Sequence, residues 1–180
     1  MISLRSKLTQ RLLSYLFLHK EQAFYINELA RQLRVDDGNL TRKLHELAGK
    51  GVLKAEPKGN LTYFRLNPQF PLLGEYERII QQTVGLEAVL REVLASMKGV
   101  HAAYLYGSYA VNQLESTSDI DLLAVGDHNS LALQKRLTPL QKQIGREINC
   151  TSMTDQEFKR RRSSDSFLRS VFSKPTIQLV

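Results

Sequence analysis

The sequence has little of what secreted and membrane proteins need. Its 180 residues include a single cysteine, Cys150, so no disulfide can form within the chain. The longest apolar run, residues 12–18, is interrupted by Ser14 and falls well short of the ~20 residues that a membrane-spanning helix requires. Residues 1–10 lack the apolar stretch and cleavage site of a secretion signal. These absences predict a cytoplasmic protein without a membrane partner.

Histidine is also sparse, and its spacing fits no metal site. The four histidines show no ligand spacing, which argues against a metal-sensing site built from them. They are His19, His45, His101 and His128. Hydrophobic residues make up 42% of the chain, which is enough for packed cores and excludes a disordered protein. The length suits one large domain or two small ones.

Positive charge is distributed unevenly along the chain. Residues 1–70 hold 12 Lys and Arg against 6 Asp and Glu, whereas residues 71–180 hold 13 against 12. The net charge of +7 therefore lies almost entirely in the first part. A small basic segment joined to a nearly neutral one predicts that the first segment binds a polyanion.

Hydrophobic spacing in residues 1–70 predicts three helices and a β-hairpin. The expected elements are a helix to about residue 19, a strand at 24–26, helices at 28–33 and 39–50, and strands at 52–56 and 61–66. This order, with the segments 26–33 and 39–44, resembles a winged helix-turn-helix regulator of the ArsR-like kind. The resemblance implies that the third helix enters the major groove of double-stranded DNA and that the hairpin contacts its backbone or minor groove.

Polar side chains of the third helix and the hairpin are the candidate DNA contacts. Three of them are expected to reach base edges and three to meet phosphates. They are, in that order, Asn39, Thr41 and Arg42, then Lys43, Lys54 and Lys58. The alternative is a winged helix used for protein contacts, whose Lys and Arg form a solvated face.

Residues 71–99 predict a long connecting helix. Apolar residues recur at helical spacing from Leu72 to about Met97, with Gly85 as a point where the helix can kink. The apolar face is wide for a lone linker, so the helix is expected to pack against both domains or against its twin in a homodimer. Winged-helix regulators usually bind near-palindromic sites as symmetric dimers, which favours the homodimer.

A Gly-Ser pair and two aspartates carry the clearest chemical signal in residues 100–180. Gly107 and Ser108 end one apolar run, and Asp119 and Asp121 open another. Side chains alternate along a strand, so the two carboxylates share one face and repel each other unless a cation binds them. Mg²⁺ prefers carboxylates with phosphate oxygens, and a Gly-Ser turn offers N–H groups to phosphate. The pattern predicts a nucleoside triphosphate site, and the alternative is a surface turn followed by two solvated aspartates.

The same residues resemble the signature of the DNA polymerase β-like nucleotidyltransferase superfamily, above all its minimal nucleotidyltransferases. The resemblance covers roughly residues 100–152. It implies that Asp119 and Asp121 hold two Mg²⁺ ions and that Gly107 and Ser108 hold the β- and γ-phosphates of the triphosphate.

The resemblance also implies a third carboxylate on the strand that follows the aspartates. The strand expected at 146–152 offers Glu147, which would complete the metal site and help to deprotonate the acceptor; the alternative is a surface ion pair. The chain also departs from the family pattern. Minimal nucleotidyltransferases often read Arg-Gly where this chain has Val111 and Asn112, so this site has less positive charge to offset a triphosphate.

We therefore predict a two-domain α/β (α+β) protein. It has a winged-helix DNA-binding domain at 1–70, a connecting helix at 71–99, and a nucleotidyltransferase-like domain with a small mixed sheet at 100–180. The predicted function is a DNA-binding transcription regulator that transfers a nucleoside monophosphate from a triphosphate to a hydroxyl of a protein, an RNA or a small molecule. One alternative is a regulator whose second domain is a catalytically weak nucleotide sensor or dimerisation module. Another is a toxin–antitoxin component that modifies a partner protein.

Overall fold

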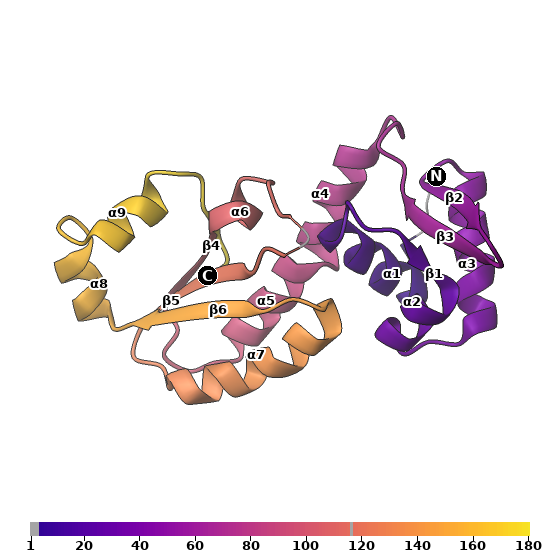
Figure 1. The fold of residues 1–180 in the computed structure, drawn as a ribbon. Helices are drawn as coiled ribbons and strands as arrows, with labels where there is room; N and C mark the ends of the chain where they lie inside the picture. Colours follow the sequence, from indigo (N-terminus) through magenta and orange to yellow (C-terminus); the bar gives the residue numbers. More distant parts are fainter. Residues whose placement is uncertain (1–3, 116) are drawn as a thin grey trace. The chain divides into compact units, whose positions relative to one another are not determined.

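The computed structural model describes residues 4–115 and 117–180. It divides the chain into two compact units, residues 1–88 (unit 1) and residues 89–180 (unit 2) (Figure 1). The division falls inside the segment that the sequence predicts to be a connector. No helix in these described parts of the chain is long and apolar enough to cross a lipid bilayer.

Unit 1 contains helices and strands in the order that its hydrophobic spacing predicts. The elements are α1 (Lys7–Leu18), β1 (Phe24–Tyr25), α2 (Ile26–Leu33), α3 (Asp37–Gly49), β2 (Leu53–Lys58), β3 (Leu61–Leu66) and α4 (Leu73–Thr83). The strands form an antiparallel sheet in the order β1-β3-β2. The assignment of this unit as a winged helix stays a prediction.

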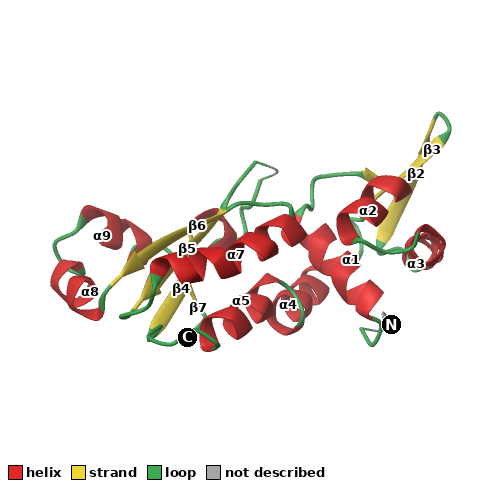
Figure 2. Cartoon of the chain, turned by 90° about the horizontal axis from the view of Figure 1, so that it is seen from below, coloured by secondary structure: helices red, strands yellow, loops and turns green. Residues whose placement is uncertain are grey.

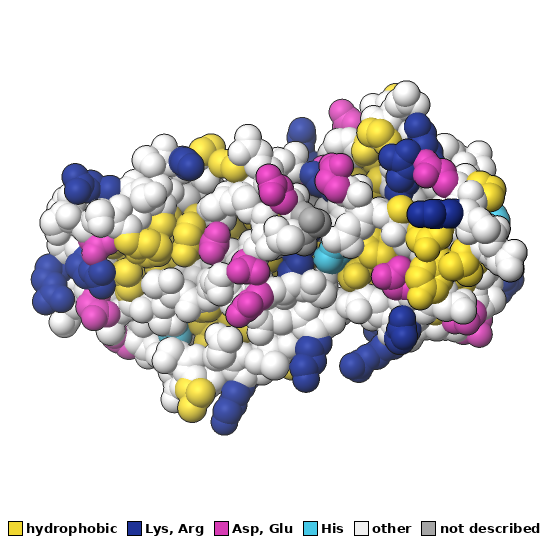
Figure 3. All heavy atoms as spheres, in the orientation of Figure 1, with side chains coloured by type: hydrophobic (Ala, Val, Ile, Leu, Met, Phe, Trp, Pro, Cys, Tyr) yellow, Lys and Arg dark blue, Asp and Glu magenta, His cyan; other side chains and the backbone are white. Residues whose placement is uncertain are grey.

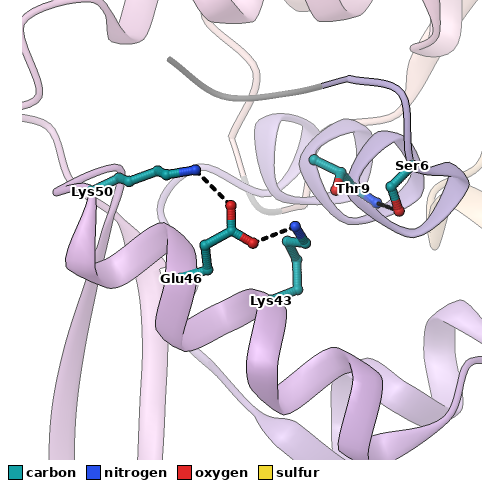
Figure 4. A network of polar contacts seen from close by, with 5 residues as sticks. All are labelled: Ser6, Thr9, Lys43, Glu46 and Lys50. Atoms are coloured by element: carbon teal, nitrogen blue, oxygen red, sulfur yellow. Dashed lines mark hydrogen bonds and ion pairs between the residues drawn. The ribbon is translucent and has the colours of Figure 1, made fainter.

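Local hydrogen bonds determine where the helices of unit 1 begin and end. The Ser6 side chain accepts a hydrogen bond from the backbone N–H of Thr9 at the start of α1 (Figure 4). Asp36 accepts one from the N–H of Asn39, at 2.8 Å, at the start of α3. Arg34 adopts the left-handed conformation, with φ of 52°, and so ends α2 before the turn into α3. Buried leucines of these helices then pack with strand residues in one core cluster.

The single connecting helix predicted from the sequence is wrong, because two helices occupy the segment. They are α4 and α5 (Leu86–Ala95). Between them the N–H of Gly85 donates to the carbonyl of Ile80 at 2.6 Å, which draws the chain into a tight turn. A Cβ on Gly85 would lie 2.7 Å from the Cα of Gln81, so the turn requires glycine. The Gln81 side-chain oxygen then accepts from the N–H of Leu86 at 3.2 Å and caps the second helix.

Unit 2 is built on a mixed four-stranded sheet, which agrees with the predicted small mixed sheet. Its elements after α5 are β4 (Ala102–Tyr106), α6 (Gly107–Ala110), β5 (Ile120–Val125), α7 (Ser130–Ile144), β6 (Ile148–Met153), α8 (Asp155–Arg161), α9 (Ser166–Phe172) and β7 (Ile177–Gln178). The strand order is β6-β5-β4-β7, in which β5 and β6 are parallel and the other pairs antiparallel. α7 supplies the crossover that a parallel pair needs and runs alongside the strands it connects (Figure 2).

Helices α8 and α9 pack on the sheet near the carboxyl end of β5. Leu123 and Val125 form a core cluster there with Met153, Phe158 and Leu168. Thr154 and Glu157 form a capping box that starts α8. Lys and Arg side chains gather over this end of unit 2 (Figure 3). Those in the last turn of α8 complement its helix dipole.

Candidate functional site

The two aspartates lie at the start of β5. Asp119 directly precedes the strand and Asp121 is its second residue. Ile120 and Leu122 are fully buried, whereas Asp119 is exposed and Asp121 half-buried. The alternation expected from the sequence is therefore present, and both carboxylates lie on the face opposite to the buried pair.

The electrostatics of this pair favour a bound cation. Partial burial, together with the neighbouring Asp119 carboxylate, raises the pKa of Asp121 above its ordinary value. Tyr106 lies directly opposite Asp121 in the antiparallel register, and burial raises the pKa of its phenol, so it stays neutral at pH 7. Ionised Asp121 therefore has a like charge on one side and a neutral ring on the other. A positive charge at this face would offset the repulsion between the two carboxylates and stabilise the ionised form of Asp121.

The Gly-Ser turn lies against Asp121. Gly107 opens α6 with φ of 70°, a left-handed conformation that residues with a Cβ rarely adopt. A Cβ built on Gly107 would lie only 2.3 Å from Oδ2 of Asp121, so the backbone of the turn approaches this carboxylate more closely than any other residue type allows. Ser108 follows and is half-buried. The structure thus brings together the turn and the aspartates that the sequence singled out.

A buried arginine holds the loop that leads into Asp119. Nη1 of Arg146 donates to the carbonyl oxygen of Glu115 at 2.8 Å and to that of Ser118 at 2.6 Å. Only 7% of Arg146 is accessible, so these hydrogen bonds satisfy a charge that would otherwise be costly to bury. Arg146 therefore positions the first aspartate.

Glu147, the predicted third carboxylate, is not brought together with both aspartates. β6 begins one residue later, at Ile148, and Glu147 is exposed just before it. Among the residues described, no three Asp, Glu, His or Cys side chains are placed to hold one metal ion. The catalytic role of Glu147 stays a prediction.

Asn149 instead faces the aspartates. It pairs with Asp121 in the parallel register of β5 and β6, and its Nδ2 donates to Oδ2 of Asp119 at 3.1 Å. Alternation along the strand expected at 146–152 puts Asn149 on the same face as Glu147, but nothing in the sequence indicated a role for it. The alternation along residues 147–151 was the signal that could have indicated this residue. The register between β5 and β6 could not be predicted, because the two strands are far apart in the chain.

The candidate DNA contacts lie on α3 and the hairpin of unit 1. On α3, Arg42 donates to the side chain of Asn39. Lys43 forms an ion pair with Glu46, which also accepts from Lys50 at 2.6 Å (Figure 4). These two lysines lower the pKa of Glu46 to about 2, so it stays ionised and competes with phosphate for their charge.

The remaining candidates are accessible as well. Thr41 donates its hydroxyl to the carbonyl of Asp37 at 2.7 Å, as is common within helices. On β2, Lys54 donates to Gln69 at 3.1 Å, and Lys58 lies 6.0 Å from the ring centre of Tyr63. All six predicted contacts are exposed or half-exposed. Whether they meet DNA stays a prediction.

Comparison with known proteins finds a family match within the second unit. Residues 89–166 match the family model described as polymerase beta, nucleotidyltransferase. No curated protein sequence matches the chain. Among solved structures, the chain is similar to a mutant of the toxin–antitoxin MntA–HpeT, at 16% identity over 53% of this chain and 73% of that one, with a TM-score of 0.40. It is also similar to a toxin–antitoxin with AMP-PNP, at 18% identity over 52% and 72%, with a TM-score of 0.39. The family match and the site at β5 thus fall on the same part of the chain, because residues 89–166 include Gly107, Ser108, Asp119 and Asp121.

Proposed function

We propose that unit 2 transfers a nucleoside monophosphate from a nucleoside triphosphate to a hydroxyl group and releases pyrophosphate. The observation that carries this proposal is the pair Asp119 and Asp121 on one face of β5, with the Gly107 turn against the second carboxylate. Such a pair suits Mg²⁺, which binds carboxylates together with phosphate oxygens. The family match over residues 89–166 supports the same chemistry.

Each residue of the site has a distinct part in the proposal. Asp119 and Asp121 hold the divalent cation, and Gly107 and Ser108 lie beside the β- and γ-phosphates. Mg²⁺ bound there would neutralise the charge that develops on the attacking and leaving oxygens. The polar groups around the aspartates hold them in place before substrate arrives, so little reorganisation is needed during the reaction.

The transfer balances without any redox partner. The acceptor's hydroxyl oxygen forms a bond to the α-phosphorus while the bond from that phosphorus to the bridging oxygen breaks, and pyrophosphate leaves with its electron pair. The hydroxyl proton passes to a base, for which Glu147 is the sequence-based candidate. The acceptor is a protein, an RNA or a small molecule.

Triphosphates radiolabelled at the α-phosphate test the proposal. The full chain is incubated with Mg²⁺ and each of the four ribonucleoside triphosphates, together with total cellular protein, RNA or metabolite extracts. We expect pyrophosphate release and label transfer that Asp119→Ala and Asp121→Ala abolish. Asp127→Ala is the matched control, because Asp127 is exposed at the opposite end of β5. Triphosphate binding without release would favour the nucleotide-sensor alternative, and neither binding nor release would refute the proposal.

We also propose that unit 1 binds double-stranded DNA as part of a homodimer. Six polar side chains lie accessible on α3 and β2, and the order of elements is that of the predicted winged helix. Leu72, which directly precedes α4, and Ile79 within α4 are 51% and 48% accessible, and they are exposed apolar side chains of the kind that a dimer contact buries.

Binding to a pool of duplex DNA at several salt concentrations tests this second proposal. Arg42→Ala with Lys43→Ala should weaken binding and flatten its dependence on salt, because phosphate contacts release counterions. Arg160→Ala, which removes an exposed charge from unit 2, is the control. Equal binding by the double variant and the control would refute the placement of the DNA contacts on α3.

A further inference from the structure

The side chain that β6 presents to the aspartates is an amide. In the parallel register Asn149 is the neighbour of Asp121, and it also reaches across to donate to Asp119 at 3.1 Å. One side chain on a neighbouring strand thus adjoins both carboxylates. Glu147, two residues earlier, joins no group placed to hold a metal in the described part of the chain.

The direction of the Asn149 hydrogen bond follows from charge. Two carboxylates without a cation repel a third oxygen, so the amide turns its N–H side toward Asp119. A cation between the aspartates reverses this preference, because it attracts the amide oxygen and repels the N–H side. A half-turn of the terminal amide exchanges the two atoms, and Asn149 is exposed, so there is room for that rotation.

We propose that Asn149 is the third protein oxygen donor of the divalent-cation site, together with Asp119 and Asp121. The assignment rests on the proposed function of that site and deepens it. Amide carbonyls are ordinary ligands of hard divalent cations. A set of two carboxylates and one neutral amide carries a charge of about −2, which balances one divalent ion and leaves a second ion to depend on the triphosphate.

Direct Mn²⁺ binding to the full chain, read from the electron paramagnetic resonance signal of free Mn²⁺, tests the assignment. Asn149→Ala should weaken binding at least tenfold, because it removes a ligand. Asn149→Asp should tighten it at least tenfold, because it adds a negative charge at the same place. Asp127→Ala is the control, because Asp127 is exposed beyond the opposite end of β5, and it should bind Mn²⁺ as the unaltered chain does. Glu147→Gln tests the rival third ligand and should lose less affinity than Asn149→Ala.

A second readout separates a ligand from a merely structural residue. Asn149→Asp places three carboxylates together, so without metal its thermal unfolding midpoint should fall, and Mn²⁺ should restore it by more than it raises that of the unaltered chain. Asn149→Ala binding Mn²⁺ within twofold of the unaltered chain would overturn the assignment, as would a larger loss in Glu147→Gln. If Asp119→Ala and Asp121→Ala also leave Mn²⁺ binding unchanged, the proposed metal site itself is refuted. If only these two variants weaken binding, the site stands and the role of Asn149 is refuted.

Discussion

Replacing Gly107 by alanine tests the link between the Gly-Ser turn and the carboxylate beside it. The substitution has two separable costs. Gly107 has φ of 70°, and a residue with a Cβ loses roughly 1–2 kcal/mol in that conformation. The new Cβ would also lie 2.3 Å from Oδ2 of Asp121, whereas ordinary contact begins at 3.4 Å, so the carboxylate must move by about 1 Å.

Gly59 provides a matched control for the first cost. It has φ of 60° at the tip of the β2–β3 hairpin, and a Cβ there would meet nothing within 4 Å. Gly59→Ala and Gly107→Ala should therefore both lower the unfolding free energy of their own unit by roughly 1–2 kcal/mol. Only Gly107→Ala displaces a group of the proposed metal site.

The decisive measurement is Mn²⁺ affinity, with circular dichroism in urea reporting stability. We expect Gly107→Ala to bind Mn²⁺ at least tenfold more weakly, because a ligand displaced by about 1 Å fits the ion poorly. Gly59→Ala should bind as the unaltered chain does. Equal Mn²⁺ affinity in the two variants would refute the argument that the turn positions Asp121.

Three further predictions follow from charge and burial. Asp121→Asn should raise the unfolding free energy of the metal-free protein by up to ~1 kcal/mol, because it removes a repulsion between accessible charges, and its thermal midpoint should rise with it; a lower midpoint would contradict the repulsion. Burial raises the pKa of the Cys150 thiol to about 11, so iodoacetamide at pH 8 should label it roughly 100-fold more slowly than a free thiol, as followed by mass spectrometry; rapid labelling would show that the thiol is not buried. The pKa of Glu46 is lowered from 4.5 to about 2, so its stabilising effect is complete above pH 4.5 and is lost as the pH falls toward 2. Over that range Glu46→Gln should show a smaller fall in thermal midpoint than the unaltered chain, and parallel curves would contradict the lysine pairing.

Local patterns allowed much of this fold to be predicted. The capping box that starts α8 depends only on Thr154 and Glu157, which are three residues apart in the sequence. The alternation around Asp121 depends on the period of a single strand, and the buried Ile120 and Leu122 confirm it. Such features are encoded within a few residues, so they can be read without knowing where the rest of the chain lies.

The features that could not be predicted depend on distant parts of the chain. Helical spacing continues across Gly85, and only the tight approach of its backbone to Gln81 breaks the helix. The choice between Glu147 and Asn149 needed the register of β6 against β5, which the intervening residues 126–147 do not reveal. Both residues fall on the predicted face, and a shift of two positions along the strand exchanges their places beside Asp121.

The two aspartates are unfavourable in the absence of a ligand, yet several parts of the chain hold them in place. The turn at Gly107 presses against one carboxylate, Arg146 fixes the loop before the other, and Asn149 donates to it from a neighbouring strand. A fold selected for stability alone would separate like charges or neutralise one of them. Backbone and side chains that instead hold a repelling pair together are what the proposed cation site requires, because a bound cation would offset the repulsion. On this proposal, the repulsion between the two carboxylates both destabilises the metal-free protein and gives the site its affinity for the ion. A variant that removes the repulsion should therefore also bind the ion more weakly.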